Sequence, residues 1–97
     1  MPFLLHKMTA LEKSISDYTD WSNPWKFFNY VIADTHLKSE EVQLFQKIWQ
    51  KAGGSDLWNF EDLTSGCKKS KAFIIENYAL NEFVIDLIVR AISYQWK

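Results

Sequence analysis

Residues 67–97 read CKKSKAFIIENYALNEFVIDLIVRAISYQWK and contain neither glycine nor proline. The stretch predicts helix, because those two residues most often end one. A single straight helix over residues 72–96 would be about 37 Å long, more than the roughly 32 Å diameter expected for a globule of this chain length. The run must therefore bend, break or protrude. Asn81 followed by Glu82 is the candidate for a break and a new N-cap, so one helix or two remain open.

The same run has an alternative interpretation as strands. Residues 73–75 and 83–92 are rich in the β-branched and aromatic residues that strands favour. No hairpin turn signal separates the two segments, which favours helix. Asp86 and Arg90 also have the spacing and order of a favourable helical ion pair.

The stretch before this run, residues 54–66, reads GSDLWNFEDLTSG. Ser55 is the expected N-cap of a short fourth helix of two or three turns, and Gly66 follows that helix. Two aromatic residues, Trp58 and Phe60, lie here among carboxylates, and the stretch has no basic residue.

A third helix is predicted over residues 39–52. Ser39 is its expected N-cap, and Glu40 and Glu41 would lie at the positive end of the helix dipole. Gly53 and Gly54 would end it in the left-handed conformation. Its expected buried side consists of Leu44, Phe45, Ile48, Trp49 and Ala52.

Residues 17–23 predict a break, and Asn23 followed by Pro24 predicts the N-cap and first-turn proline of a second helix. The apolar face expected for this helix consists of Trp25, Phe28, Val31 and Ile32, widened by Phe27 and Tyr30.

A first helix is indicated by an apolar stripe at Leu4, Met8, Leu11, Ile15 and Tyr18. It begins either near Pro2 or later, at a capping box formed by Thr9 and Glu12. We therefore expect one all-α domain over residues 1–97, a compact bundle of about five helices.

Composition limits the function. The chain has 97 residues, of which 47% are hydrophobic, and a net charge of −1, which argues against a bulk nucleic-acid binder. The single cysteine excludes an internal disulfide framework. The longest apolar stretch, residues 83–92, contains two charges and is about half the length that a membrane span needs. With no secretory signal in the first residues, we expect a cytoplasmic protein.

Catalytic chemistry has little support in the sequence. His6 and His36 have no partner at ligand spacing, so we expect no metal, and Gly53-Gly54 is not a phosphate-binding loop. Cys67 precedes Lys68, Lys69 and Lys71, which would lower a thiol pKa, but no general base is marked beside it. We expect no enzyme, no catalytic residue and no cofactor. A cysteine-dependent enzyme remains the alternative that a Cys67→Ser variant would test.

The lysines at 68, 69 and 71 could also contact RNA or an acidic surface. The chain has one arginine in total, and arginine is the residue that reads phosphates and bases in fork geometry. A solvated helix start is the simpler interpretation of this group.

The acidic–aromatic stretches are the most informative feature. Aromatic rings supply area to an interface, and carboxylates around them select a basic partner. The alternative is that Trp58 and Phe60 hold the short helix onto the core while the acids are solvated. The partner contacts predicted from these two stretches are Asp17, Asp20, Trp21, Asp56, Trp58, Phe60, Glu61 and Asp62.

Three short motifs occur in an order that resembles the immunity proteins of nuclease bacteriocins. They are Ser-Ile-Ser-Asp-Tyr-Thr at 14–19, Ser-Glu-Glu at 39–41 and Gly-Ser-Asp-Leu at 54–57. In general character the chain also looks like the broader class of immunity proteins of contact-dependent growth inhibition systems. The family's short helix continues with two tyrosines and a proline, where this chain has Asn59, Phe60 and Glu61, so Asp56 carries over cleanly as a partner contact.

The resemblance implies a function in bacterial competition without chemistry. The protein would bind a cognate toxin, a basic nuclease domain, and block its substrate site, with no direct contact to nucleic acid or membrane. The third helix would add Glu40, Glu41 and Gln43 to the contacts. The alternative is a small helical adaptor or inhibitor, including a phage-encoded one, that docks on another host protein. The oligomeric state stays open.

Overall fold

A computed structural model of the chain describes residues 9–58 and 62–96. Within these ranges all the regular structure is helical, and the predicted all-α bundle is confirmed. The helices are α1 (Ala10–Asp17), the 3-10 helix η2 (Pro24–Lys26), α2 (Phe27–Ile32), α3 (Ser39–Ala52), α4 (Ser55–Trp58), α5 (Leu63–Asn77) and α6 (Glu82–Gln95). The expectations for Pro2, Leu4, His6, Met8, Asn59, Phe60 and Glu61 fall outside the described residues.

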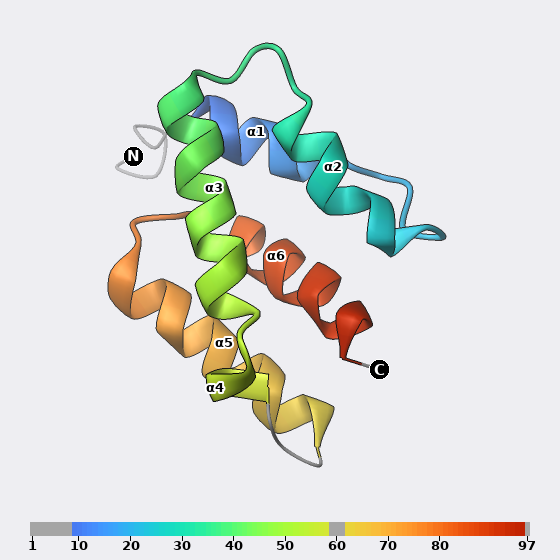
Figure 1. Cartoon of the computed structure of the whole chain (residues 1–97), viewed down its shortest axis with the longest axis vertical. Coiled ribbons are helices and arrows are strands. Elements are labelled where there is room, and N and C mark those ends of the chain that lie inside the picture. Colours follow the sequence, from blue (N-terminus) through green and yellow to red (C-terminus); the bar gives the residue numbers. More distant parts are fainter. Residues whose placement is uncertain (1–8, 59–61, 97) are drawn as a thin grey trace, which may run out of the picture.

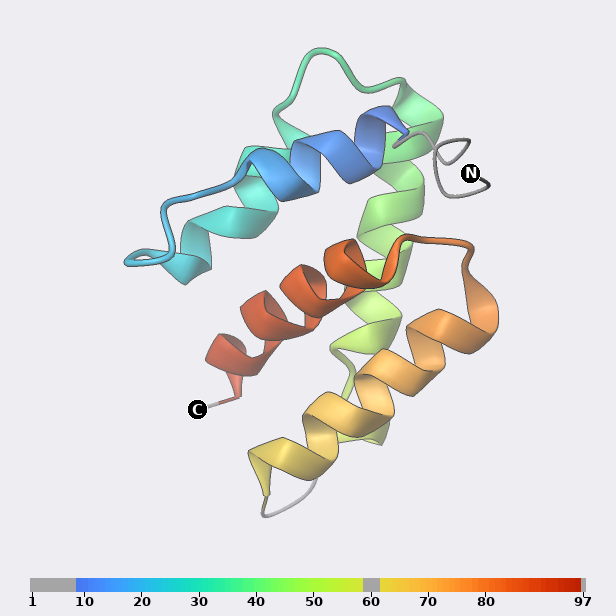
Figure 2. The same cartoon turned by 180° about the vertical axis from the view of Figure 1, so that it is seen from behind.

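Helix α6 is the centre of the bundle. It lies between α1 and α5 in both views of the molecule and also packs against α3 and η2 (Figures 1 and 2). Its buried residues are Val84, Ile85, Ile88, Val89, Ala91 and Ile92. Because neighbours cover it on several sides, its sequence is apolar over a wider arc than that of a surface helix.

The long C-terminal run is broken, which is one of the three outcomes that its length allowed. Helix α5 ends at Asn77, and α6 begins after Asn81, whose side chain accepts a hydrogen bond from the Phe83 N–H at 2.8 Å. Two helices that fold back on each other fit within a body measuring 40 × 30 × 24 Å. The predicted break and N-cap at Asn81 are therefore confirmed.

Helix α1 begins at the later of the two predicted starts. The Thr9 hydroxyl accepts from the Glu12 N–H at 3.1 Å, and the Glu12 carboxylate accepts from the Thr9 N–H at 2.9 Å. This is the predicted capping box, which satisfies two backbone donors at once.

Two predicted caps of α3 are wrong. Ser39 is the first residue inside the helix, and the Lys38 N–H before it is bound by the Glu41 carboxylate at 3.0 Å. Gly53 has φ −99°, so it ends α3 without the left-handed conformation. It suits the position through close packing instead, because a Cβ there would lie 2.9 Å from the Trp49 carbonyl oxygen.

The fourth helix is shorter than predicted. Helix α4 has four residues, and it begins with Ser55, while Leu63 and Gly66 belong to α5. Gly66 does not follow the short helix as a stop: it is buried in α5 under the ring of Trp58. Tertiary packing therefore explains this glycine better than a turn does.

The predicted ion pair between Asp86 and Arg90 is replaced by two other contacts. Asp86 binds Lys71 of α5 at 2.9 Å, and Glu82 binds the same ammonium group at 2.9 Å. The Arg90 guanidinium lies over the Trp21 ring, 4.4 Å from its centre. Both residues thus join α6 to neighbouring segments, which sequence spacing along one helix cannot predict.

Candidate functional site

The predicted partner contacts lie in three separate places on the fold. Among the described residues, one group lies at the end of α1 and just after it, a second begins α3, and a third (Asp56, Trp58 and Asp62) lies in α4 and before α5 at the other end of α3 (Figure 1). Helix α3 has 14 residues, so its ends are about 21 Å apart. The structure thus does not bring all the predicted contacts onto one small face.

Trp58 is a core residue. Only 4% of its surface is exposed, and its indole N–H donates to the Ala52 carbonyl oxygen at 2.7 Å. Its ring covers Gly66 and stacks on Trp96, with ring centres 6.5 Å apart. The expectation that Trp58 contacts a partner is therefore corrected, and its role is to hold α4 onto the core.

Two of the predicted acidic contacts cap helices. Glu41 binds the Lys38 N–H, as described above, and Asp62 accepts from the Thr64 N–H at 2.9 Å and from the Ser65 hydroxyl at 3.3 Å. Capping by a carboxylate at a helix N-terminus explains both residues structurally. Of the remaining predicted contacts in these groups, those that the structure describes are exposed: Glu40, Gln43 and Asp56.

The segment after α1 is held by its own side chains. The Tyr18 hydroxyl is shared between the carbonyl oxygens of Asp20 and Asn23, and the Trp21 indole N–H donates to the Tyr18 carbonyl oxygen at 3.1 Å. The Asn23 amide donates to both carboxylate oxygens of Asp20, at 3.0 and 3.1 Å. Asn23 occupies the N-cap position before the first-turn Pro24, as predicted, but its side chain orients Asp20 and makes no capping hydrogen bond.

Tyr18 and Trp21 also anchor this segment to the core. Tyr18 packs edge-on against Phe27, with ring centres 5.5 Å apart, and Trp21 stacks on the same ring at 5.5 Å. Burial, and then the charge of Asp20, raise the pKa of Tyr18 above its ordinary value of 10.0, so its hydroxyl remains a donor to a higher pH than an exposed phenol does. The Arg90 guanidinium covers one face of the Trp21 ring, so Trp21 makes its contacts within the chain and leaves little of this ring face for a partner.

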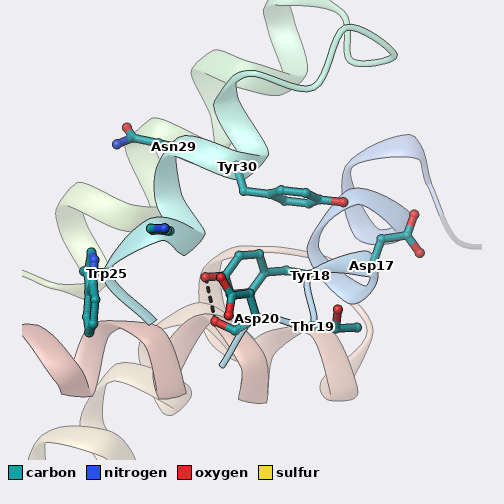
Figure 3. Close-up of a pocket in the computed structure, with 8 residues that line it drawn as sticks. Asp17, Tyr18, Thr19, Asp20, Trp25, Asn29 and Tyr30 are labelled. Carbon is teal, nitrogen blue, oxygen red and sulfur yellow. Dashed lines mark hydrogen bonds between the residues drawn. The ribbon is translucent and has the colours of Figure 1, made fainter. Parts of the chain in front are cut away.

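A hollow opens beside this segment, which we name the acidic hollow (Figure 3). Its volume is about 530 Å³, and Trp25 of η2, Tyr30 of α2, Asp17 of α1 and Asp20 of the following segment are among the residues that line it. In Figure 3, Tyr30 lies beside Tyr18, and Trp25 and Asp17 lie at opposite sides of the group. Its full lining is Asp17, Tyr18, Thr19, Asp20, Trp25, Lys26, Asn29 and Tyr30. The structure thus brings the predicted contacts Asp17 and Asp20 together with two exposed aromatic rings.

Trp25 is the residue that the sequence analysis missed. It was predicted to lie on the buried face of its helix, yet 68% of its surface is exposed. The reason is that residues 24–26 form a 3-10 helix, which turns by about 120° per residue instead of 100°. Phe27 and Val31 take the buried positions instead. One signal was available: six large apolar residues within 25–32 cannot all fit on one helical face.

A second hollow lies on the other side of Trp25, and we name it the apolar hollow. It has a volume of about 390 Å³ and is lined by Pro24, Trp25, Phe28, Asn29, Trp49, Ala91, Tyr94 and Gln95, without a charged side chain among these residues. Trp25 and Asn29 line both hollows and form the ridge between them.

The described residues offer little support for other chemistry. Burial and then Asp62 raise the pKa of the Cys67 thiol, opposite to the effect expected from the nearby lysines and unfavourable for a nucleophile. Lys71 is engaged by Glu82 and Asp86. Over residues 9–58 and 62–96, no three His, Cys, Asp or Glu side chains are grouped to hold a metal ion.

The length and polarity of a helix decide whether it can cross a membrane. Within the ranges that the structure describes, every helix is too short or too polar to cross a bilayer.

Comparison of the chain with family models, with curated proteins and with solved structures found no match in any of the three.

Proposed function

We propose that this chain is a binding protein without catalytic activity, and specifically an immunity protein that neutralises a cognate antibacterial toxin carrying a basic nuclease domain. The observation that carries the proposal is the 68% exposure of Trp25 between two hollows. Tryptophan is the residue type most enriched among side chains that dominate binding energy. The nuclease identity rests on the motifs at 14–19, 39–41 and 54–57.

Charge supports the choice of a basic partner. Asp17 and Asp20 line the acidic hollow, and Asp17 is also the last residue of α1, where the helix dipole is negative. The last turn of α1 has no basic residue to offset these charges. A nuclease binds phosphate groups through positive charge, so a protein that covers this charge blocks its substrate.

The acids at the start of α3 and beside α4 have a different role in this proposal. Glu40 and Asp56 are exposed but line neither hollow beside Trp25, so they act through the long-range field that steers a basic partner into encounter. Trp25 and Tyr30 then supply the contact area that slows dissociation.

The test compares three versions of the full chain: wild type, Trp25→Ala and Phe83→Ala. Phe83 is a matched control, because it is also a large exposed aromatic residue, 57% exposed, on a different helix. Each tagged version is used to isolate companions from the source lysate at moderate salt, and mass spectrometry identifies them. We expect one stoichiometric companion with a basic nuclease domain, retained by Phe83→Ala and lost with Trp25→Ala.

The companion is then expressed alone and together with each version. Growth arrest by the companion, rescued by wild type and Phe83→Ala but not by Trp25→Ala, is the expected result. A companion without toxic activity would instead identify an adaptor and overturn the immunity proposal. Equal retention by Trp25→Ala would show that the interface lies elsewhere.

A further inference from the structure

We infer that the two hollows beside Trp25 receive two neighbouring side chains of one partner segment, a basic side chain in the acidic hollow and an apolar one in the apolar hollow. This inference rests on the proposed function and specifies how the same surface recognises its partner. It commits to a peptide segment of a protein whose surface presents arginine or lysine next to an aliphatic residue.

The acidic hollow has the chemistry of a cation site. Among the described residues, two aspartates and one lysine line it, so the net charge of this lining is negative. Trp25 and Tyr30 also line it and are 68% and 43% exposed. Aromatic faces attract guanidinium and ammonium groups, most strongly with tryptophan. Asn23 holds the Asp20 carboxylate in place, so little ordering of this acceptor is needed on binding.

The chain contains an internal example of the same contact. The guanidinium of Arg90 lies 4.4 Å from the centre of the Trp21 ring, on the segment that leads to Trp25. A partner arginine whose guanidinium lies over Trp25 would make the same kind of contact on the neighbouring surface. Its planar guanidinium N–H groups would donate to the carboxylates of Asp17 and Asp20.

The apolar hollow is preformed by the core. Phe28 stacks on Phe45 with ring centres 5.5 Å apart and lies 5.2 Å from the Trp49 ring, so its wall is fixed before any partner arrives. Without a charged group in its lining, this hollow selects an aliphatic or aromatic side chain. Asn29, on the ridge, presents a carboxamide that can bind the backbone of a segment crossing from one hollow to the other.

The experiment uses short peptides and does not require the toxin. In an extended peptide, residues i and i+2 point to the same side about 7 Å apart, which suits two side chains that straddle one indole ring. The probes are therefore acetyl-Arg-Gly-Leu-amide and acetyl-Leu-Gly-Arg-amide, one for each chain direction. Their controls replace arginine with citrulline, which has nearly the same shape but no charge. Binding is measured by NMR on the full, ¹⁵N-labelled chain.

We expect at least one arginine peptide to shift the Trp25 indole signal and the amides of Asp20 and Asn29, with about fivefold weaker binding of its citrulline partner. Asp17→Asn should weaken binding of the arginine peptide but not of the citrulline peptide. Lys26→Gln should strengthen binding of the arginine peptide, because Lys26 is the one cation among the described residues that line this hollow. Tyr94→Ala should weaken both peptides by a similar factor. Phe83→Ala should change neither affinity.

Equal binding of the arginine and citrulline peptides, or shifts that leave Trp25 unaffected, would overturn the inference. If the companion still requires Trp25 in that case, the proposed function stands and only this mode of recognition fails. If the peptides bind as expected but no toxic companion exists, the recognition stands and the immunity function fails. The amide spectrum of each variant reports directly whether it is folded.

Discussion

The carboxylate of Glu12 in α1 accepts a hydrogen bond from the backbone N–H of Asn81, 69 residues away, at 2.6 Å. The same side chain closes the capping box of α1, so one buried carboxylate joins the first turns of two helices. It is 1% exposed, and burial of a charged group is tolerated when its hydrogen bonds are satisfied. This contact places α1, and therefore the segment carrying Asp17 and Asp20, against the central helix.

We expect Glu12→Gln to lower the free energy of unfolding by about 2 kcal/mol, because a charged acceptor of backbone N–H groups is replaced by a neutral amide. Urea unfolding of both proteins at pH 7 measures the difference. Glu40→Gln makes the same chemical change at an exposed position and should alter stability by less than about 0.5 kcal/mol. An equal effect of both variants would contradict the role assigned to Glu12.

Tyr18 predicts an alkaline dependence of stability. Its pKa is raised from the ordinary value of 10.0, so the folded chain holds the phenol proton more tightly than the unfolded chain does. The resulting stabilisation is fully present below pH 10 and is lost as the pH rises through the folded-state pKa. Ionised Tyr18 also loses its donor to the carbonyl oxygens of Asp20 and Asn23.

Tyr18→Phe tests both consequences. At pH 7 the variant should be about 1 kcal/mol less stable, because the two carbonyl groups lose their donor. Between pH 9 and 11 its stability should fall less steeply than that of the wild type. Thermal unfolding at pH 7 gives the difference in stability, and thermal unfolding at several pH values between 9 and 11 gives the slope. Tyr30→Phe is the matched control, since Tyr30 is 43% exposed, and a slope equal to that of Tyr18→Phe would contradict the assignment.

Gly66 should not tolerate a side chain. A Cβ at this position would lie 2.4 Å from Cε3 of Trp58, although alanine is the better helix former. We expect Gly66→Ala to destabilise the chain by about 2 kcal/mol through displacement of the indole ring. At Gly54 the same substitution meets carbonyl oxygens at 3.4 and 3.5 Å, and it should change the free energy of unfolding by less than about 1 kcal/mol. Circular dichroism during chemical unfolding compares the two variants.

Substitution of an acid in α4 distinguishes the two possible positions of the interface, at α4 or beside Trp25. The resemblance places a contact at Asp56, whereas the Trp25 surface does not include it. We expect Asp56→Lys to slow association several-fold by weakening steering, and Asp17→Lys to reduce affinity about tenfold or more. Association and dissociation rates measured on the isolated companion distinguish the two effects. Loss of binding with Asp56→Lys but not with Trp25→Ala would place the interface at α4.

Asp62 needs a different substitution in that experiment. Lysine at position 62 would remove the cap of Thr64 and cost about 1 kcal/mol, so a loss of binding would be ambiguous. Asp62→Asn removes the charge and retains a capping oxygen. It should leave the free energy of unfolding within about 0.5 kcal/mol of the wild type while testing the charge alone.

Local sequence was sufficient for the helices and several of their ends. The capping box of Thr9 and Glu12 and the N-cap at Asn81 depend on residues within one turn of each other, and such contacts can be found from spacing. Length excluded one straight helix inside the globule, and the N-cap signal of Asn81 followed by Glu82 placed the break.

Tertiary structure decided which aromatic residues are buried and which charges meet. Trp58 is covered because α5 passes over it with a glycine at the point of contact, and Trp25 is exposed because a 3-10 turn rotates it away from the core. Asp86 binds Lys71 rather than Arg90 because α5 lies alongside α6. Sequence periodicity determines which residues share a helical face, but the neighbour that covers that face is set only when the helices pack.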